Sequence, residues 1–257
     1  MKKLIFLGLF FCHCSFSQIS KEKLAEEVEN PISYLMRIPI QDNYGFGIGP
    51  YDRAQNKLIL QPVIPFHLTP NLNLIIHTFI PYIWWPDIYS PSGTYTGLSN
   101  IEVDFYFSQT NSKNFFWGIG PSLLFPTSTN SNITAKETGL GVNLSTVWTP
   151  SNWVFGILIK QIWSVGGPDM SKLDLNYFVN LNFSNGYYLT TSPNITLDWE
   201  KEPGEQWVIP FGLGMGKVFK LGKRYLNSSL QGYYAVVTPT PASEWTIRAQ
   251  IAFLFPK

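Results

Sequence analysis

The chain ends in a segment, residues 244–255, in which apolar and polar side chains alternate with a period of two. Its odd positions carry Trp, Ile, Ala, Ile, Phe and Phe, and its even positions carry Glu, Thr, Arg, Gln, Ala and Leu. This period predicts a β-strand with one apolar and one mostly polar face. Because aromatic residues begin and end the apolar face, the segment is typical of a membrane barrel, with apolar residues towards lipid and polar residues in the lumen.

The same alternation recurs along most of the chain, in segments separated by turn residues. We place strands near 35–46, 57–68, 72–84, 98–109, 115–126, 137–149, 152–164, 172–183, 187–199, 206–219, 225–237 and 244–255. Short and longer connections alternate between them, as periplasmic turns and outer loops do in bacterial barrels. The sequence therefore predicts an all-β fold, a closed antiparallel transmembrane β-barrel of about 12 strands, with both termini on the short-turn side.

The composition fits this prediction and excludes other classes. Charged residues make up 14% and aromatic residues 16% of the chain, whereas soluble domains carry about 25% charged residues. The longest apolar run after the first residues, 153–159, stops at Lys160 and is too short for a membrane helix, which needs about 20 residues. If the mature protein enters a membrane, it does so as a closed barrel. A net charge of +1 argues against nucleic acid as a partner.

Residues 1–17 have the pattern of a signal peptide. Lys2 and Lys3 precede an apolar run at 4–11, and small residues at 15 and 17 form a cleavage site. Both cysteines of the chain lie inside this segment, so the mature protein has none. Export without disulfides fits a bacterial envelope protein, and the predicted location is the outer membrane.

Residues 18–34 form an N-terminal segment that precedes the barrel, which occupies 35–257. A short helix is expected at 20–29, ended by Asn30-Pro31. Two interpretations stay open for this segment: a solvated periplasmic helix or leader, and a plug or partner-binding element.

Ionisable side chains fall on the faces opposite to the apolar ones and are expected in the lumen. The residues nearest the middle of their strands, which we take as the candidate constriction, are Glu102, Asp104, Lys160, Asp174, Asp198 and Arg248. A charged side chain facing lipid costs roughly 2–4 kcal/mol for Arg or Lys at mid-bilayer, so a lumen position is first a structural requirement. The residues are expected to form either a mutually neutralising network or a polar constriction that selects solutes. Arg248 is expected opposite Asp104, Asp174 and Asp198.

Gly212, Gly214 and Gly216 occupy every second position of one strand. They are expected on the lumen face, where missing side chains open space or allow the wall to curve sharply. The surrounding sequence does not match a nucleotide-binding loop. His67 and His77 are expected to fill the lumen as polar side chains and not to bind a metal ion, because no acidic residue stands at ligand spacing beside them. No cofactor, metal or catalytic residue is predicted.

Several segments together carry a resemblance to a known family. They are residues 30–31, 38–44, 61–66, 209–222 and 253–257. In these segments the chain resembles a family of bacterial outer-membrane barrels labelled as transporters or neuromedin U-like, related to the MetA-pathway phenol-degradation family. The resemblance implies an outer-membrane barrel with a presumed transport role, and it supplies no catalytic residues.

The sequence thus predicts a monomeric, porin-like barrel in the outer membrane of a Gram-negative bacterium, passively passing small or partly apolar solutes. Its expected partners are outer-membrane lipid, the barrel assembly machinery and a small solute. Two alternatives stay open. One is a structural or surface-binding barrel whose outer loops, among them residues 85–95, contact a partner. The other is an outer-membrane hydrolase of lipids or esters, which would need a serine and histidine pair with an orienting third group.

Overall fold

Residues 21–110 and 112–256, which the computed structural model describes, contain one α-helix, one short 3-10 helix and fifteen strand segments. The elements are α1 (Lys21–Glu29), β1 (Met36–Ile48), β2 (Arg53–Leu60), β3 (Val63–Thr69), β4 (Leu72–Pro86), β5 (Thr94–Leu98), β6 (Ile101–Gln109), β7 (Phe115–Phe125), β8 (Thr138–Trp148), β9 (Trp153–Gly166), β10 (Ser171–Asn182), η1 (Ser184–Gly186), β11 (Tyr187–Thr191), β12 (Asn194–Asp198), β13 (Trp207–Leu221), β14 (Arg224–Val237) and β15 (Trp245–Phe255). The predicted signal peptide lies outside the described residues.

Three of the barrel's strands are each interrupted once. Gln61-Pro62 separates β2 from β3, Ser99-Asn100 separates β5 from β6, and Ser192-Pro193 separates β11 from β12. Each pair of segments continues along the same neighbour, for example β11 and β12 along β13. Proline has no N–H for the strand ladder, which explains two of the breaks. The segments therefore form a closed antiparallel barrel of 12 strands, and the predicted number is confirmed.

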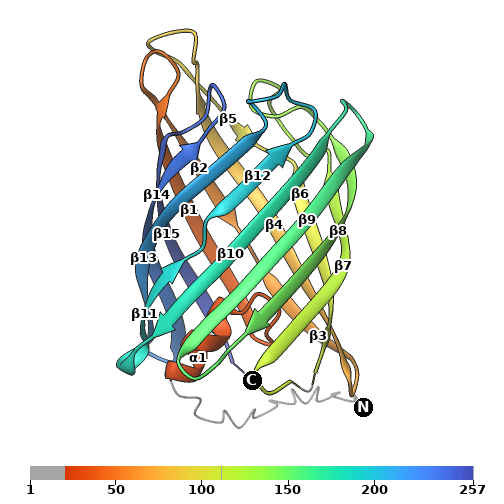
Figure 1. Cartoon of the computed structure of the whole chain (residues 1–257), viewed down its shortest axis with the longest axis vertical. Helices are drawn as coiled ribbons and strands as arrows, with labels where there is room; N and C mark the ends of the chain where they lie inside the picture. The colour runs from red at the N-terminus through yellow and green to blue at the C-terminus, as the bar shows by residue number, and fades with distance from the viewer. Residues whose placement is uncertain (1–20, 111, 257) are drawn as a thin grey trace, which may run out of the picture.

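The barrel closes because the last strand pairs with the first. Met36 lies opposite Phe255 and Phe46 opposite Trp245, in an antiparallel register without a shift. Both strands meet the helix α1 at one end of the barrel, the lower end in Figure 1. We call this the short-turn end and the opposite one the long-loop end.

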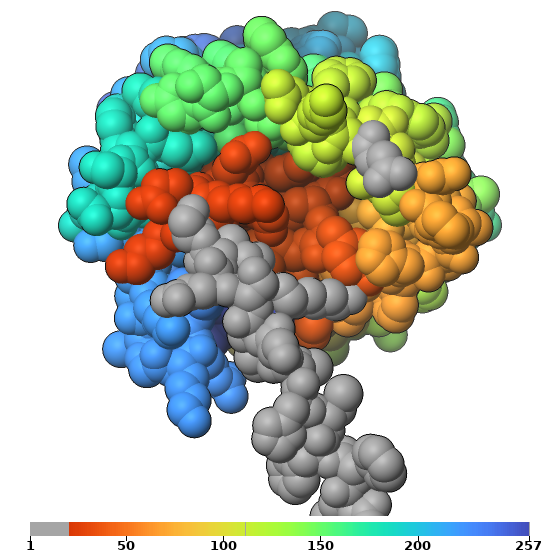
Figure 2. Space-filling model, turned by 90° about the horizontal axis from the view of Figure 1, so that it is seen from below, coloured from red at the N-terminus to blue at the C-terminus, as the bar shows by residue number. Residues whose placement is uncertain are grey.

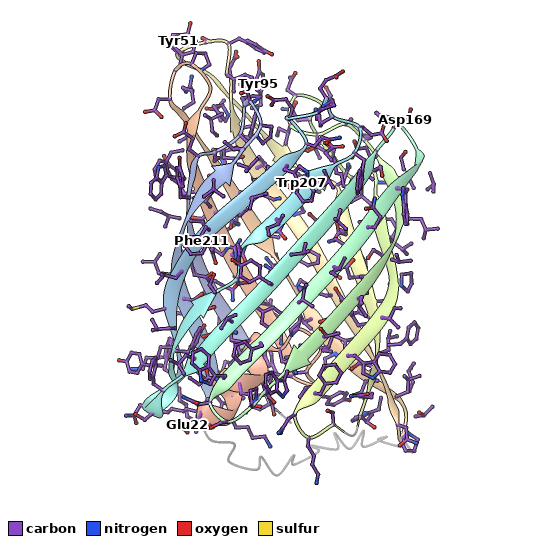
Figure 3. All side chains as sticks on the ribbon, in the orientation of Figure 1. Glu22, Tyr51, Tyr95, Asp169, Trp207 and Phe211 are labelled. Atoms are coloured by element: carbon purple, nitrogen blue, oxygen red, sulfur yellow. The ribbon has the colours of Figure 1, made fainter. Side chains whose placement is uncertain are left out.

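The outer surface is apolar between two belts of aromatic side chains. On β13 the outward Phe211, Leu213 and Met215 are 66%, 65% and 63% exposed, and Figure 3 shows Phe211 below Trp207 on the wall. Exposed aromatic residues near the long-loop end are Trp84, Trp163, Trp199, Trp207 and Trp245, and near the short-turn end Phe66, Phe115, Trp117, Trp148, Trp153 and Tyr187. An apolar band between aromatic girdles is the surface that a barrel presents to lipid.

Apolar side chains also fill the inside of the barrel at its short-turn end. Leu24, Ala25 and Val28 of α1 are buried against the inner wall, together with the residues Leu35, Tyr188, Val218, Ala252 and Leu254. A second buried group gathers around Ile32 and comprises Val63, Ile75, Tyr106, Val147, Val154 and Phe178. The N-terminal segment, residues 21–35, therefore lies inside the barrel mouth. Among the described residues no helix is long and apolar enough to cross a membrane.

Candidate functional site

The lumen encloses a cavity of about 780 Å³. Thr134 and Ser243, from the connections at the long-loop end, line one end of the cavity, and Val28 and Glu29 of α1 line the other. Figure 2 shows α1 lying across the barrel when it is viewed from the short-turn end. The cavity thus extends along the barrel from the long loops to the N-terminal segment.

Four of the six predicted lumen residues come together on one side of this cavity, and we call them the Lys160 cluster. Lys160 on β9 forms an ion pair with Glu102 on β6, and its Nζ lies 3.7 Å from Asp104 Oδ2 and 3.5 Å from Asp174 Oδ2. The side chains of Lys160 and Asp104 are only 12% and 2% exposed. One ammonium group therefore serves three carboxylates, of which Glu102 and Asp104 are largely buried and Asp174 is 32% exposed.

Arg248 lies outside the Lys160 cluster. Its Nε donates to Asn43 Oδ1 at 3.1 Å and its NH1 to the backbone oxygen of Ser192 at 2.8 Å. The guanidinium carbon lies 4.9 Å from the centre of the Tyr233 ring. The Ser192 carbonyl lies at the break between β11 and β12 and accepts from both Arg248 and Asn176 Nδ2, the latter at 3.2 Å.

Asp198 is also separate from the cluster. It ends β12 near the long loops, where its Oδ1 accepts from the backbone N–H of Glu200 at 3.2 Å. An aspartate that bonds two residues ahead stabilises a turn. The expected arrangement of Arg248 opposite three aspartates is therefore corrected: Asp104 and Asp174 pair with Lys160, and Asp198 caps a turn.

The sequence did not single out the residues that flank Arg248. Asn43 on β1 lies directly opposite Arg248 on β15 and directly opposite Lys57 on β2. All three line the cavity, and we call them the cationic row. Lys57 was identified only as a lumen-facing charge, because alternation shows the face of a residue but not its neighbours on other strands.

The predicted glycines do not line the cavity. A Cβ added at Gly212 or Gly214 would overlap the backbone of β14, and one at Gly216 would overlap the ring of Tyr188. The glycines therefore allow close approach of the neighbouring strand and of an aromatic ring. The Tyr188 hydroxyl donates to Asn227 Oδ1 at 2.8 Å.

Replacing Gly216 with alanine is expected to destabilise the barrel by about 1–3 kcal/mol, because the added methyl group displaces the buried Tyr188 ring. The matched control is Gly232→Ala on β14, where an added Cβ meets no atom within 4 Å. The control should change stability by less than about 0.5 kcal/mol. Urea unfolding followed by tryptophan fluorescence measures both variants. Equal midpoints would contradict the assigned role of Gly216.

Helix α1 is fixed to the barrel at both ends. At its C-terminal end Arg37 NH1 donates to the backbone oxygens of Asn30 at 3.0 Å and Glu27 at 3.4 Å, where a cation also favours the helix dipole. At its N-terminal end the Glu22 carboxylate accepts from the backbone N–H of Asn185 at 3.0 Å. The helix therefore has defined polar anchors in addition to its apolar contact.

Glu29 connects α1 to the cavity. Burial raises the pKa of its carboxyl above the ordinary value, while the neighbouring Tyr188, the charge of Arg37 and a hydrogen bond from Asn227 oppose this shift. The ionised form of Glu29 therefore depends on these three partners.

The two histidines have separate environments. His67 stacks on Tyr34, with ring centres 3.8 Å apart, and its Nδ1 lies 2.6 Å from Asn73 Oδ1. His77 lines the cavity on the register position opposite Asp104. Within residues 21–110 and 112–256, no three His, Asp or Glu side chains are grouped so that they could hold a metal ion.

The fold is that of an outer-membrane β-barrel, with an apolar outer surface and a lumen lined by polar and charged side chains. No family model matches the sequence, and no curated protein matches it, so the neuromedin U-like and MetA-pathway labels rest on the quoted segments alone.

Among solved structures, the chain is similar to the COG4313 outer membrane channel from Pseudomonas putida F1. The TM-score is 0.66 and the identity 14%, over 86% of this chain and 94% of that one. It is also similar to the NanC porin, with a TM-score of 0.54 and 11% identity over 84% of this chain and 98% of that one. At these identities the similarity concerns the fold, and function has to be argued from the site.

Proposed function

We propose that this chain forms a passive channel for small solutes in a bacterial outer membrane. The observation that carries the proposal is the 780 Å³ cavity, which extends from the long loops to the N-terminal segment and is lined by charged and polar side chains. A purely structural barrel of this size has no need of a hollow polar interior, because a narrow barrel can be filled by side chains. The lipid-type outer surface and the similarity to two outer-membrane channels support the same conclusion.

The side chains that line the cavity also indicate the size and the chemical character of the solute. Charged residues of the Lys160 cluster and the cationic row face the same cavity as apolar side chains such as Phe79 and Ile162. A solute that passes must therefore be small, and it can carry both polar and apolar groups. Residues 1–17 would direct export, and the barrel would act as a monomer.

A non-catalytic role fits the positions of the histidines. Acyl or ester hydrolysis by a serine needs an adjacent base within hydrogen-bond distance. In the part of the chain that the structure describes, His67 bonds Asn73 and His77 has no hydrogen-bond partner. Neither arrangement activates a serine.

Liposome swelling tests the proposal. Vesicles that contain the purified barrel are expected to swell in isotonic arabinose, and to swell much more slowly in isotonic raffinose. Thr246→Trp, which places a bulky ring in the lined cavity, should reduce the arabinose rate by roughly half or more. The matched control is Ile247→Trp, because Ile247 is 46% exposed on the outer wall. Vesicles that do not swell, with a correctly folded barrel, would refute a transport role.

A further inference from the structure

The cationic row consists of Arg248, Asn43 and Lys57 on the three adjacent strands β15, β1 and β2. Adjacent strands lie about 4.8 Å apart, so the Cα atoms of Arg248 and Lys57 are about 10 Å apart with Asn43 between them. Both long side chains start at one level of the barrel wall and line the same cavity. They can therefore reach a single small group in the lumen.

Arg248 is held in position without a carboxylate. Its two hydrogen bonds, to Asn43 Oδ1 and the Ser192 carbonyl, and the Tyr233 ring beside it fix the guanidinium. An arginine has five N–H donors in a planar fork, so donors are left for a ligand. Among the described residues no carboxylate oxygen lies within 4.0 Å of the Arg248 side-chain nitrogens.

Lys57 also lacks a direct ion-pair partner, and the carboxylates of Asp174 and Glu102 act on it only at longer range. Its ammonium group forms no ion pair with any described carboxylate, and the residue is exposed to the lumen rather than packed away. In contrast, Lys160 has three carboxylates around it, and Lys172 lies 3.9 Å from Glu137. Two lumen cations, one on each side of Asn43, thus lack the ion-pair partners that Lys160 and Lys172 have.

The opposite wall accounts for the missing partners. In the strand order of the closed sheet, β9 lies half-way around the ring from β1. Lys160 on β9 binds Glu102 and Asp104 on β6 and Asp174 on β10, and these carboxylates are not in ion-pair contact with the row. The lumen therefore has an excess of carboxylates in the Lys160 cluster, on β6, β9 and β10, and an excess of cations in the row, on β15, β1 and β2.

The strand next to the row on the other side is apolar towards the lumen. Ile83 on β4 is the register partner of Lys57, and Phe79 and Pro81 follow it at every second position along the cavity lining. A ligand whose anionic group meets Arg248 and Lys57 would place a short apolar body against these side chains.

We infer that the cationic row binds the carboxylate of a small organic anion with a short aliphatic body as it moves through the lumen. A planar guanidinium fork matches a carboxylate in two parallel hydrogen bonds, and Lys57 adds a second positive charge. The inference rests on the proposed channel function and names the class of solute that this lumen favours.

The test uses butyrate with two probes of the same size, neutral butyramide and cationic n-butylammonium. Titration calorimetry on the full chain in detergent, at constant ionic strength, is expected to detect binding of butyrate alone. Arg248→Gln and Lys57→Gln should each weaken butyrate binding by about ten-fold, the effect of one charge-assisted contact. Arg248→Lys should lie between wild type and Arg248→Gln. Lys113→Gln, in an exposed turn outside the cavity, is the charge-matched control and should bind like wild type.

The site is refuted if butyrate does not bind the folded wild type, if n-butylammonium binds as well as butyrate, or if both glutamine variants keep wild-type affinity. Heat-modifiable migration on gels establishes that each variant is folded. Lys57→Gln changes only an exposed lumen side chain, so it tests the site even if Arg248→Gln fails to fold. If the barrel binds butyrate but does not mediate swelling, the channel proposal is refuted and the binding site is supported. If the barrel mediates swelling but does not bind butyrate, the binding site is refuted and the channel proposal is supported.

Discussion

Replacing Lys160 with methionine is expected to destabilise the barrel by about 3–5 kcal/mol, the range for removing one partner of a buried ion pair. Methionine keeps most of the volume of the lysine side chain but removes the ammonium group. Glu102 and Asp104, whose side chains are 16% and 2% exposed, would then face each other without a cation. Urea unfolding of the barrel in lipid vesicles, followed by tryptophan fluorescence, measures the loss.

The matched control is Lys172→Met. Lys172 is 44% exposed and lies 3.9 Å from a single carboxylate, Glu137, so this change should cost less than about 1 kcal/mol. Adding Glu102→Gln and Asp104→Asn to Lys160→Met should recover most of the lost stability, because neutral groups do not need the cation. If Lys160→Met and Lys172→Met unfold at the same urea concentration, the Lys160 cluster does not stabilise the wall.

Replacing Leu24 with aspartate is expected to release helix α1 from the inner wall and to raise single-channel conductance by roughly two-fold or more. Leu24 is fully buried among Tyr188, Val218 and Leu254, and a carboxylate at this position would lose its hydration without gaining a partner. Since Val28 and Glu29 line the lower end of the cavity, departure of the helix would widen the passage there. Planar-bilayer recording measures the conductance, and trypsin cleavage after Lys21, which both variants keep, reports whether the helix is exposed.

Lys23→Asp serves as the control for this change. It introduces the same side chain at the neighbouring position, on the exposed face of the helix, and should leave both conductance and cleavage close to wild type. A Leu24→Asp barrel with unchanged conductance would show that the helix does not restrict the lumen.

The fold could be predicted from the sequence almost completely. A strand period of two, alternating short and long connections and a low charged content all have local causes, so they can be read without knowing which strands are neighbours. The pairing of β15 with β1 followed from the even number of strands. The breaks at Gln61-Pro62 and Ser192-Pro193 affect only the continuity of a strand, and the count of barrel strands was unaffected.

The candidate site could be predicted only in part. Alternation identified Glu102, Asp104, Lys160 and Asp174 as lumen residues, and their neutralisation by one another follows from opposite charges in a confined space. Asp198 was misassigned to the middle of the barrel because the end of its strand is set by the turn that its own side chain stabilises. For the N-terminal segment, the apolar positions Leu24, Ala25 and Val28 indicated an amphipathic helix, but their partners are distributed over several barrel strands.

By itself, the sequence determined which face of each strand is apolar, how many strands there are and at which end the termini lie. Only the tertiary structure decided which lumen residues share a level and a wall. Closure of the barrel fixes the register between strands that are far apart in the chain, and this register places Arg248, Asn43 and Lys57 side by side. It also brings three carboxylates to Lys160 on the opposite wall. A period of two specifies the side of the sheet to which a residue belongs, whereas its partners depend on the stagger of the whole ring.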